Sequence, residues 1–150
     1  MISHEEAIAR VTAPGAPFEI RAEDVLGEPM EVYANRQRSL GSLMRASDRF
    51  GSREYLVTDG RRITFAEHYA AVAALAAALR SDYGVAKGDR VGICAANNPD
   101  WIIAFWAAVS LGAIAVGMNS MWAAPEMRHG LDLTSPKVVI ADGPRREVIG

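Results

Sequence analysis

The stretch from Asp89 to Met118 constrains the fold more than any other part of the sequence. It contains a short apolar run, a polar turn, a longer apolar run that ends at a glycine, and a second short apolar run. This order predicts strand, helix, strand. The first run, residues 90–96, is apolar on both of its alternating faces, which is typical of a parallel strand buried between two layers of helices. We therefore expect a central strand here, followed by a helix and by a second parallel strand over residues 113–118.

Three consecutive residues in the polar turn predict where the helix begins. Asn98 can cap it with its side chain, Pro99 suits the first helical position, and Asp100 places negative charge in the first turn. Large apolar residues then recur at helical spacing before Gly112 offers a left-handed stop: Trp101, Ile102, Phe105, Val109 and Leu111. Such a unit gathers its loops at the carboxyl ends of the strands, where ligands of parallel sheets bind.

A membrane span is a competing interpretation, because residues 101–125 contain no charged side chain. A spanning helix needs about 20 apolar residues. Gly112 and Gly117 interrupt the run, however, and the cap at Asn98 sets its start, which leaves a helix of about 13 residues or roughly 20 Å. We expect no membrane span.

The segment before this unit predicts a hairpin and a helix. Two β-prone runs surround Asp59-Gly60, which is a strong hairpin signal. Thr64 and Glu67 form a capping box that opens an alanine-rich helix, expected to run to Tyr83 and to stop at Gly84. Its apolar residues keep helical spacing and its alanines leave the other side smooth, so we expect most of its surface to be covered.

The segment after Met118 continues the alternation of helices and strands. A loop leads into a short helix over about residues 124–133, weakened by Gly130 in its interior, and then into a third apolar strand over residues 138–142. The order predicts an α/β fold: a doubly wound, mostly parallel sheet with a preceding β-hairpin. A further helix would be needed to cover the third strand, so we expect an incomplete part of a larger domain.

The first third of the chain shows no sustained period. Prolines and glycines are scattered through it, which predicts an irregular lead-in over residues 1–50 with one short amphipathic helix within Ser39–Phe50. The expected organisation is therefore this lead-in, followed by a partial α/β domain over residues 51–150.

Composition excludes several classes of function. Half of the 150 residues are apolar and the formal charge is −2, so nothing indicates binding to nucleic acid. The basic pairs are small and scattered, and we expect them to be solvated surface: Arg36/Arg38, Arg61/Arg62 and Arg145/Arg146. The single cysteine, Cys94, lies in a predicted buried strand, and the start of the chain does not have the pattern of a signal peptide. Both observations favour a cytoplasmic location.

No motif in the sequence identifies a reaction. His4, His68 and His129 lie on different predicted elements, and we expect structural or surface roles for them. Neither Gly-x-Gly-x-x-Gly nor Gly-x-x-x-x-Gly-Lys-Ser/Thr occurs, and no serine lies in a nucleophile elbow. Helix capping accounts for the polar loop at residues 97–100 without a ligand. We therefore name no catalytic, cofactor-binding or metal-binding residue.

Two phrases carry a resemblance to a known family: GDRVGICAANNPDWIIAFWAAVSLGAIAVGMN and, after a loop, PEMRHGLDLTSPKVVIAD. They resemble the opening of the adenylate-forming (AMP-binding) superfamily, the acyl-CoA synthetases and their relatives. The upstream phrase REYLVTDGRRITFAEHYAAVAALAAAL is similar to the family's hairpin and following helix. The lead-in GEPMEVYANRQRSL resembles that of bacterial fatty-acyl-CoA synthetases in particular. Ala123 departs from the pattern, because the family usually caps the next helix with threonine there.

The resemblance implies a two-step reaction in a longer parent enzyme. A carboxylic acid, in particular a fatty acid, attacks ATP with Mg²⁺ to give an acyl-adenylate, and coenzyme A then displaces AMP. The phosphate loop, the adenine and ribose sites and the catalytic lysine of such enzymes follow later in the chain than residue 150. The resemblance thus implies that residues 1–150 bind no cofactor, are inactive alone and pack against the remainder of their own polypeptide.

Two readings other than this enzyme remain open on the sequence. The chain could be a non-catalytic binding or interaction module or, less favoured, a membrane-anchored protein that uses residues 101–125. Lys87 and Lys137 lie in turns before strands, and we expect both at the surface.

Overall fold

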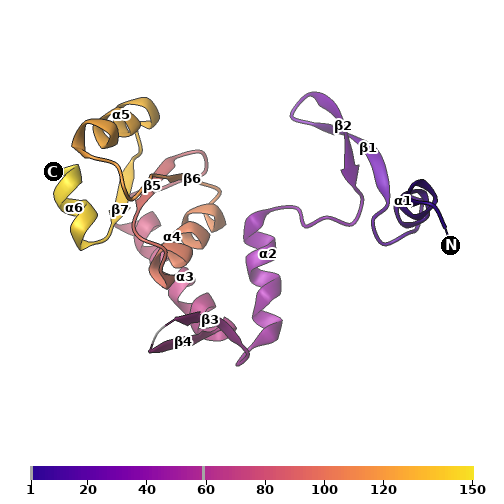
Figure 1. Ribbon diagram of the computed structural model, residues 1–150, viewed down its shortest axis with the longest axis horizontal. Coiled ribbons are helices and arrows are strands. Elements are labelled where there is room, and N and C mark those ends of the chain that lie inside the picture. Colours follow the sequence, from indigo (N-terminus) through magenta and orange to yellow (C-terminus); the bar gives the residue numbers. More distant parts are fainter. Residues whose placement is uncertain (1, 59) are drawn as a thin grey trace. The chain divides into compact units, whose positions relative to one another are not determined.

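The computed structural model describes residues 2–58 and 60–150, and the chain divides into two compact units, one ending at Arg38 and one running from Ser39 to Gly150 (Figure 1). Asp59, in the predicted hairpin turn, lies outside the described residues. Each unit is described by itself below.

The first unit contains regular structure where an irregular lead-in was expected. Helix α1 (His4–Thr12) is followed by an antiparallel hairpin of β1 (Ile20–Val25) and β2 (Glu28–Tyr33). Leu26 and Gly27 both have positive φ, as a two-residue turn of this kind requires. The strands bury no face, so they lack the apolar alternation by which a strand is usually found in a sequence. The hairpin is held by backbone pairing between the two strands, by the turn, and by an ion pair between Glu23 and Arg36 (2.8 Å).

The second unit has the predicted alternation of elements. They are α2 (Leu40–Ser47), a 3-10 turn η1 (Asp48–Phe50), β3 (Glu54–Thr58), β4 (Arg61–Thr64), α3 (Phe65–Ser81), β5 (Arg90–Cys94), α4 (Pro99–Ser110), β6 (Ile114–Gly117), α5 (Ala124–Thr134), β7 (Val138–Ala141) and α6 (Gly143–Ile149). The antiparallel pairing of β3 with β4 confirms the hairpin.

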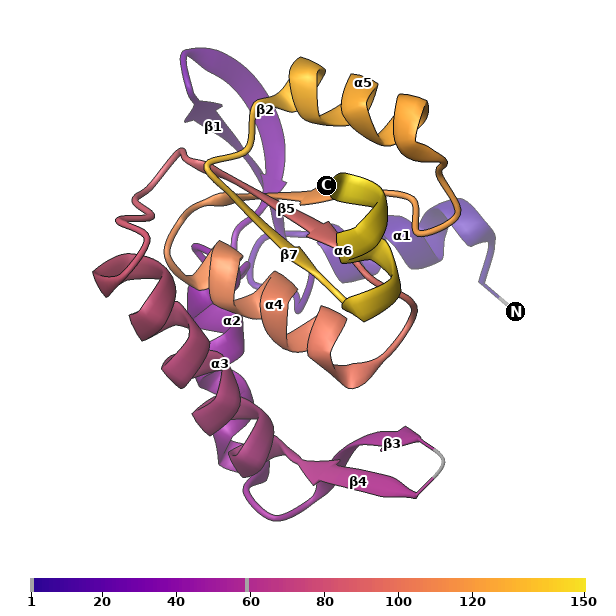
Figure 2. The same ribbon diagram turned by 90° about the vertical axis from the view of Figure 1, so that its left-hand side faces the viewer.

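The sheet is three-stranded and parallel, in the order β6-β5-β7. Strand β5 is central, and its residues from Val91 to Cys94 are all buried, as predicted. Helices cover both faces: α3 and α4 lie on one side of the sheet, and α5 and α6 on the other (Figures 1 and 2). The doubly wound arrangement is thereby confirmed.

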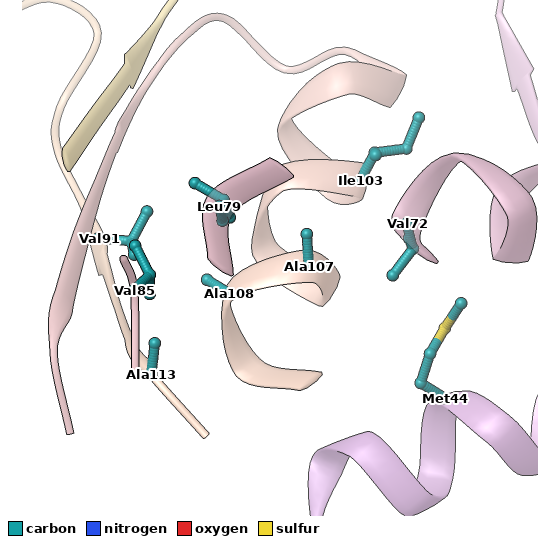
Figure 3. Packing of buried hydrophobic residues seen from close by; sticks show 9 residues of the cluster. All are labelled: Met44, Val72, Leu79, Val85, Val91, Ile103, Ala107, Ala108 and Ala113. Carbon is teal, nitrogen blue, oxygen red and sulfur yellow. The ribbon is translucent and has the colours of Figure 1, made fainter. Parts of the chain in front are cut away.

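The larger core lies between α2, α3, α4 and one face of the sheet (Figure 3). Its buried members are Met44, Val72, Leu79, Val85, Val91, Ile103, Ala107, Ala108 and Ala113. Helix α4 turns mostly small residues to this core, whereas Trp101 and Phe105 are only half buried, with their rings stacked at 5.9 Å. Alanines allow the backbones of α3 and α4 to approach closely, which explains why the smaller residues take the inner face.

The second core lies under α5 and α6 and contains Cys94, Met118 and Met127. Val148 and Ile149 of α6 pack against it. Helix α6 therefore covers β7, so the expectation that no helix of this chain would cover the third strand was wrong.

Helix α3 begins as predicted, with a reciprocal capping box between Thr64 and Glu67. It ends at Ser81, earlier than expected, and Gly84 has the predicted positive φ. The expected coverage was wrong: only His68, Val72 and Leu79 are buried on this helix, and many of its alanines face solvent. Among the helices of the described residues, none is long and apolar enough to span a membrane.

Candidate functional site

The carboxyl ends of β5, β6 and β7 meet at one edge of the sheet, and Asp142 connects the chain segments there. This residue follows β7 directly. Its Oδ2 atom accepts a hydrogen bond of 3.0 Å from the backbone N–H of Ala96, in the loop after β5. Its Oδ1 atom accepts one of 3.1 Å from the backbone N–H of Arg145 and so caps α6.

Arg145 extends this network to the third strand. Its Nη1 atom lies 3.2 Å from Oδ2 of Asp142, and its Nε donates to the carbonyl oxygen of Ser120, after β6, at 3.1 Å. Two side chains thus join the segments that follow all three parallel strands. Only 22% of the Arg145 side chain is exposed, so the expectation of a solvated surface arginine was wrong for this residue.

The electrostatics of this edge keep Asp142 ionised. The hydrogen bond from the Ala96 N–H lowers the pKa of the carboxyl group most. Partial burial opposes this, and the backbone N–H and guanidinium of Arg145 lower the pKa further. The ionised carboxylate accepts the two backbone hydrogen bonds that hold the loop after β5 and the start of α6.

The polar loop after β5 begins α4 as predicted. Oδ1 of Asn98 accepts a hydrogen bond of 2.9 Å from the Trp101 N–H, and Pro99 is the first residue of the helix. Asp100 forms an exposed ion pair of 3.5 Å with Arg61 of β4. Capping thus accounts for Asn98, whereas Asn97 is exposed.

Two hollows border this loop. A cavity of about 140 Å³ lies between the start of α4 and the ends of β5 and β7, and both Asp100 and Asp142 line it. A wider, mostly apolar hollow of about 390 Å³ lies between Leu56–Thr58 of the hairpin and the residues from Asn97 to Ile102. Within residues 2–58 and 60–150, no group of three or more His, Cys, Asp or Glu residues could hold a metal ion.

Lys137 connects elements at the opposite edge of the sheet. Its Nζ donates to Oδ2 of Asp89 at 2.8 Å and to the carbonyl oxygen of Gly84 at 2.6 Å. The bond from Lys137 is the main reason why the pKa of Asp89 is lowered. The Lys137 side chain is 44% exposed, so it lies at the surface as expected. It also joins the turns before β5 and β7 through its bonds to Gly84 and Asp89. Lys87 is exposed, and its aliphatic stem packs over Gly112.

The three histidines lie on α1, α3 and α5, whereas Cys94 is the last residue of β5, at the carboxyl edge. His4 and His129 are exposed, whereas His68 is buried on α3. Cys94 is fully buried, and burial raises the pKa of its thiol. A buried, protonated thiol of this kind is unreactive.

Reasoning from the sequence missed the roles of Asp142 and Arg145. One signal was available: Asp142 stands directly before Gly143 and Pro144, a combination that marks a helix start. Nothing in the local sequence, however, shows that the same carboxylate also reaches Ala96.

Comparison with protein-family models shows that residues 43–149 match the model described as AMP-binding enzyme. The long-chain-fatty-acid–CoA ligase FadD13 of Mycobacterium tuberculosis is 39% identical over 88 residues, which are 59% of this chain and 17% of that protein. The acyl-CoA ligase sidI of Beauveria bassiana is 36% identical over 104 residues, or 67% of this chain and 18% of that protein. The chain thus spans less than a fifth of the length of these relatives.

Solved structures show the same similarity in three dimensions. The inhibitor-bound N-terminal domain of FACL13 from M. tuberculosis superposes with a TM-score of 0.68 at 32% identity, covering 75% of this chain and 29% of that one. The anthranilate CoA ligase AuaEII in complex with anthranoyl-AMP superposes with a TM-score of 0.70 at 26% identity, covering 74% of this chain and 22% of that one.

Proposed function

Because the chain belongs to the AMP-binding enzyme family, we propose that it is the N-terminal portion of an ATP-dependent acyl-CoA ligase. The observation that carries this proposal is the family match over residues 43–149, which covers the α/β alternation from within α2 to the end of α6. The similarity to a long-chain-fatty-acid–CoA ligase supports a fatty acid as the substrate.

The proposed reaction has two steps. The fatty-acid carboxylate attacks the α-phosphate of ATP with Mg²⁺, forming an acyl-adenylate and pyrophosphate. The thiol of coenzyme A then attacks the acyl carbon and releases AMP. Such catalysis depends on positioning the reactants and on neutralising phosphate charge. The buried free thiol of Cys94 is compatible with a reducing compartment, so the proposal includes a cytoplasmic location.

The described residues do not fit ATP, Mg²⁺ or coenzyme A as ligands. The sequence contains no glycine-rich phosphate loop, and the carboxylates at the carboxyl edge are ion-paired rather than grouped for a metal. No step of the reaction is therefore assigned to a residue of this chain. We propose that the second unit is a scaffold: its sheet and the Asp142–Arg145 network hold loops against which the remainder of the polypeptide packs. Residues 1–150 alone are accordingly expected to be inactive.

Two experiments test this proposal. Pyrophosphate release from the 150-residue protein with ATP, Mg²⁺ and a panel of fatty acids is expected to stay at the background rate, and formation of acyl-adenylate would contradict the scaffold role. In the second experiment, residues 43–149 replace the matching segment of FadD13. We expect ligase activity in this chimera, and a chimera that folds but forms no acyl-CoA would contradict the assignment.

A non-catalytic binding module is the second candidate, and one observation favours it: the sequence has no glycine-rich phosphate loop, and the described residues include no group of three or more His, Cys, Asp or Glu that could hold a metal ion. The chimera separates the two candidates, because a module that has diverged from the enzyme scaffold would fold in the chimera without supporting catalysis.

A further inference from the structure

The hairpin of β1 and β2 in the first unit has open edges. It forms a two-stranded sheet, so one edge of each strand pairs with no other strand within residues 2–58 and 60–150 (Figure 1). No residue of either strand is buried, and a two-stranded hairpin is only marginally stable in water by itself. An open edge presents a row of unpaired N–H and C=O groups that another strand can join.

The hydrogen bonds of the hairpin show which residues of β1 face its open edge. The backbone N–H of Ala34 donates to the carbonyl oxygen of Glu19 at 2.8 Å, so these two residues form a hydrogen-bonded pair. Such pairs alternate along an antiparallel ladder, and the register is continuous to the turn. The even-numbered residues of β1 therefore direct their N–H and C=O groups away from β2. These residues are Ile20, Ala22 and Asp24, and all three are exposed.

The two edges differ in their capacity to pair. The residues of β2 that face outwards by the same alternation are Pro29, Glu31 and Tyr33. Pro29 has no N–H to donate, and proline is a common means of protecting an edge strand. The edge of β1 contains no proline and keeps all of its donors. A strand that joins the hairpin is therefore expected at β1, and addition there does not continue at β2.

The charges along β1 favour a second copy of the same strand as the partner. When two β1 strands pair antiparallel with the twofold axis at Ala22, Arg21 of each copy lies directly opposite Glu23 of the other. Opposite charges in this position stabilise a strand pair and like charges destabilise it. Moving the axis to residue 21 or to residue 23 would place two arginines or two glutamates opposite each other. The axis at Ala22 avoids both.

The side chains are already arranged for such a pairing. Arg21 and Glu23 lie on one face of β1, with 3.3 Å between Nη2 and Oε2, and 46% and 27% of their side chains are exposed. The two copies would therefore join their ion pairs into one cluster of alternating charge. Ala22 at the axis has the smallest side chain of the strand, so it does not obstruct the close approach of two backbones.

We propose that the first unit mediates self-association: the edge of β1 pairs antiparallel with β1 of a second copy, with the twofold axis at Ala22, to give a four-stranded sheet. The assembly is a closed dimer, because each copy uses the same edge. This inference does not depend on the proposed ligase chemistry.

The first test measures the dimer by analytical ultracentrifugation of the 150-residue protein over a range of concentrations. We expect a dissociation constant in the micromolar to millimolar range, since one pair of short strands is a small interface. Ala22→Pro should raise this constant about 10-fold or more, because both hydrogen bonds at the axis are lost. Glu31→Pro is the matched control: it lies opposite Ala22 within the hairpin but faces the outer edge of β2, and it should leave the constant unchanged.

The second test uses disulfide formation, in case the proline variants disturb the hairpin. The Cα atoms of a facing hydrogen-bonded pair are about 5.5 Å apart, which suits a disulfide, so Ala22→Cys should link two copies under mild oxidation. Ile20→Cys is the control on the same edge, because its two copies would be about 14 Å apart in this register. The single native cysteine, Cys94, is fully buried and does not compete.

Three results would each overturn the proposal. They are a monomer at every concentration, equal dissociation constants for the two proline variants, and equal cross-linking of the two cysteine variants. A monomer would leave the edge of β1 to another occupant, such as the remainder of the polypeptide.

Discussion

Substitution of Gly130 by alanine tests whether this glycine makes room for Trp122. Gly130 is buried in the interior of α5, a position at which glycine is usually about 1 kcal/mol less favourable than alanine. A Cβ atom at this position would lie 2.8 Å from Cζ3 of Trp122 and 3.4 Å from Cε of Met118. Normal carbon contacts are about 3.5–4.0 Å, so the indole would have to move by roughly 1 Å.

The two effects oppose each other. Overpacking of this kind costs about 1–3 kcal/mol, against a gain of about 1 kcal/mol in helix propensity. Gly130→Ala should therefore lower the free energy of unfolding by up to about 2 kcal/mol. In a Trp122→Ala background the clash is absent, and the same substitution should raise that free energy by about 0.5–1 kcal/mol.

The reversal of sign is measured with a double-mutant cycle. Urea unfolding of the four proteins, followed by circular dichroism because one fluorophore is removed, should give a coupling energy of about 1–3 kcal/mol between the two positions. If Gly130→Ala has the same effect in both backgrounds, Trp122 does not need this glycine and the packing argument is wrong.

Three further outcomes are expected. Asn98→Ala should lower the free energy of unfolding by about 1 kcal/mol, and Asn98→Asp by much less, because aspartate also caps the helix; equal urea midpoints for the two variants would exclude a capping role. The pKa values of Asp89 and Asp142 are lowered by folding, so the unfolded chain binds these protons more readily. The two ionised carboxylates should therefore stabilise the fold fully at pH values above their ordinary pKa of 3.8, and this stabilisation should be lost as the pH falls below it. Asp142→Asn should flatten that part of the curve of unfolding free energy against pH. Cys94 should react with a thiol reagent at the rate of global or local unfolding, since it is fully buried; fast labelling under native conditions would show that the second core is open.

Much of the second unit could be predicted because its local signals agree with its global pattern. Asn98 followed by Pro99 marks the start of α4, the box of Thr64 and Glu67 marks the start of α3, and Gly112 has the left-handed conformation that ends a helix. Each signal depends on neighbours a few residues away. The central place of β5 also follows from its sequence, because only a strand covered on both faces is apolar on both.

The hairpin in the first unit could not be found in this way. Its strands bury no face, so the apolar period that predicts strands is absent, and only the turn at Leu26 and Gly27 points to it. The inner face of α4 was equally hidden, since periodicity finds an apolar stripe and does not show whether large or small side chains lie at a helix contact.

The candidate site depends on contacts between residues far apart in the chain. Asp142 and Ala96 are 46 positions apart, and Arg145 and Ser120 are 25 apart. The parallel sheet brings them together because the ends of β5, β6 and β7 share one edge.

The sequence by itself determined the order of elements from α2 to β7, the starts of α3 and α4, and the family, because short-range patterns encode these features. The tertiary structure alone decided that a carboxylate and a guanidinium join three loops, that Gly130 makes room for an indole, and that His68 is buried. Such features arise from the spatial meeting of distant side chains, and no local pattern encodes where those side chains meet.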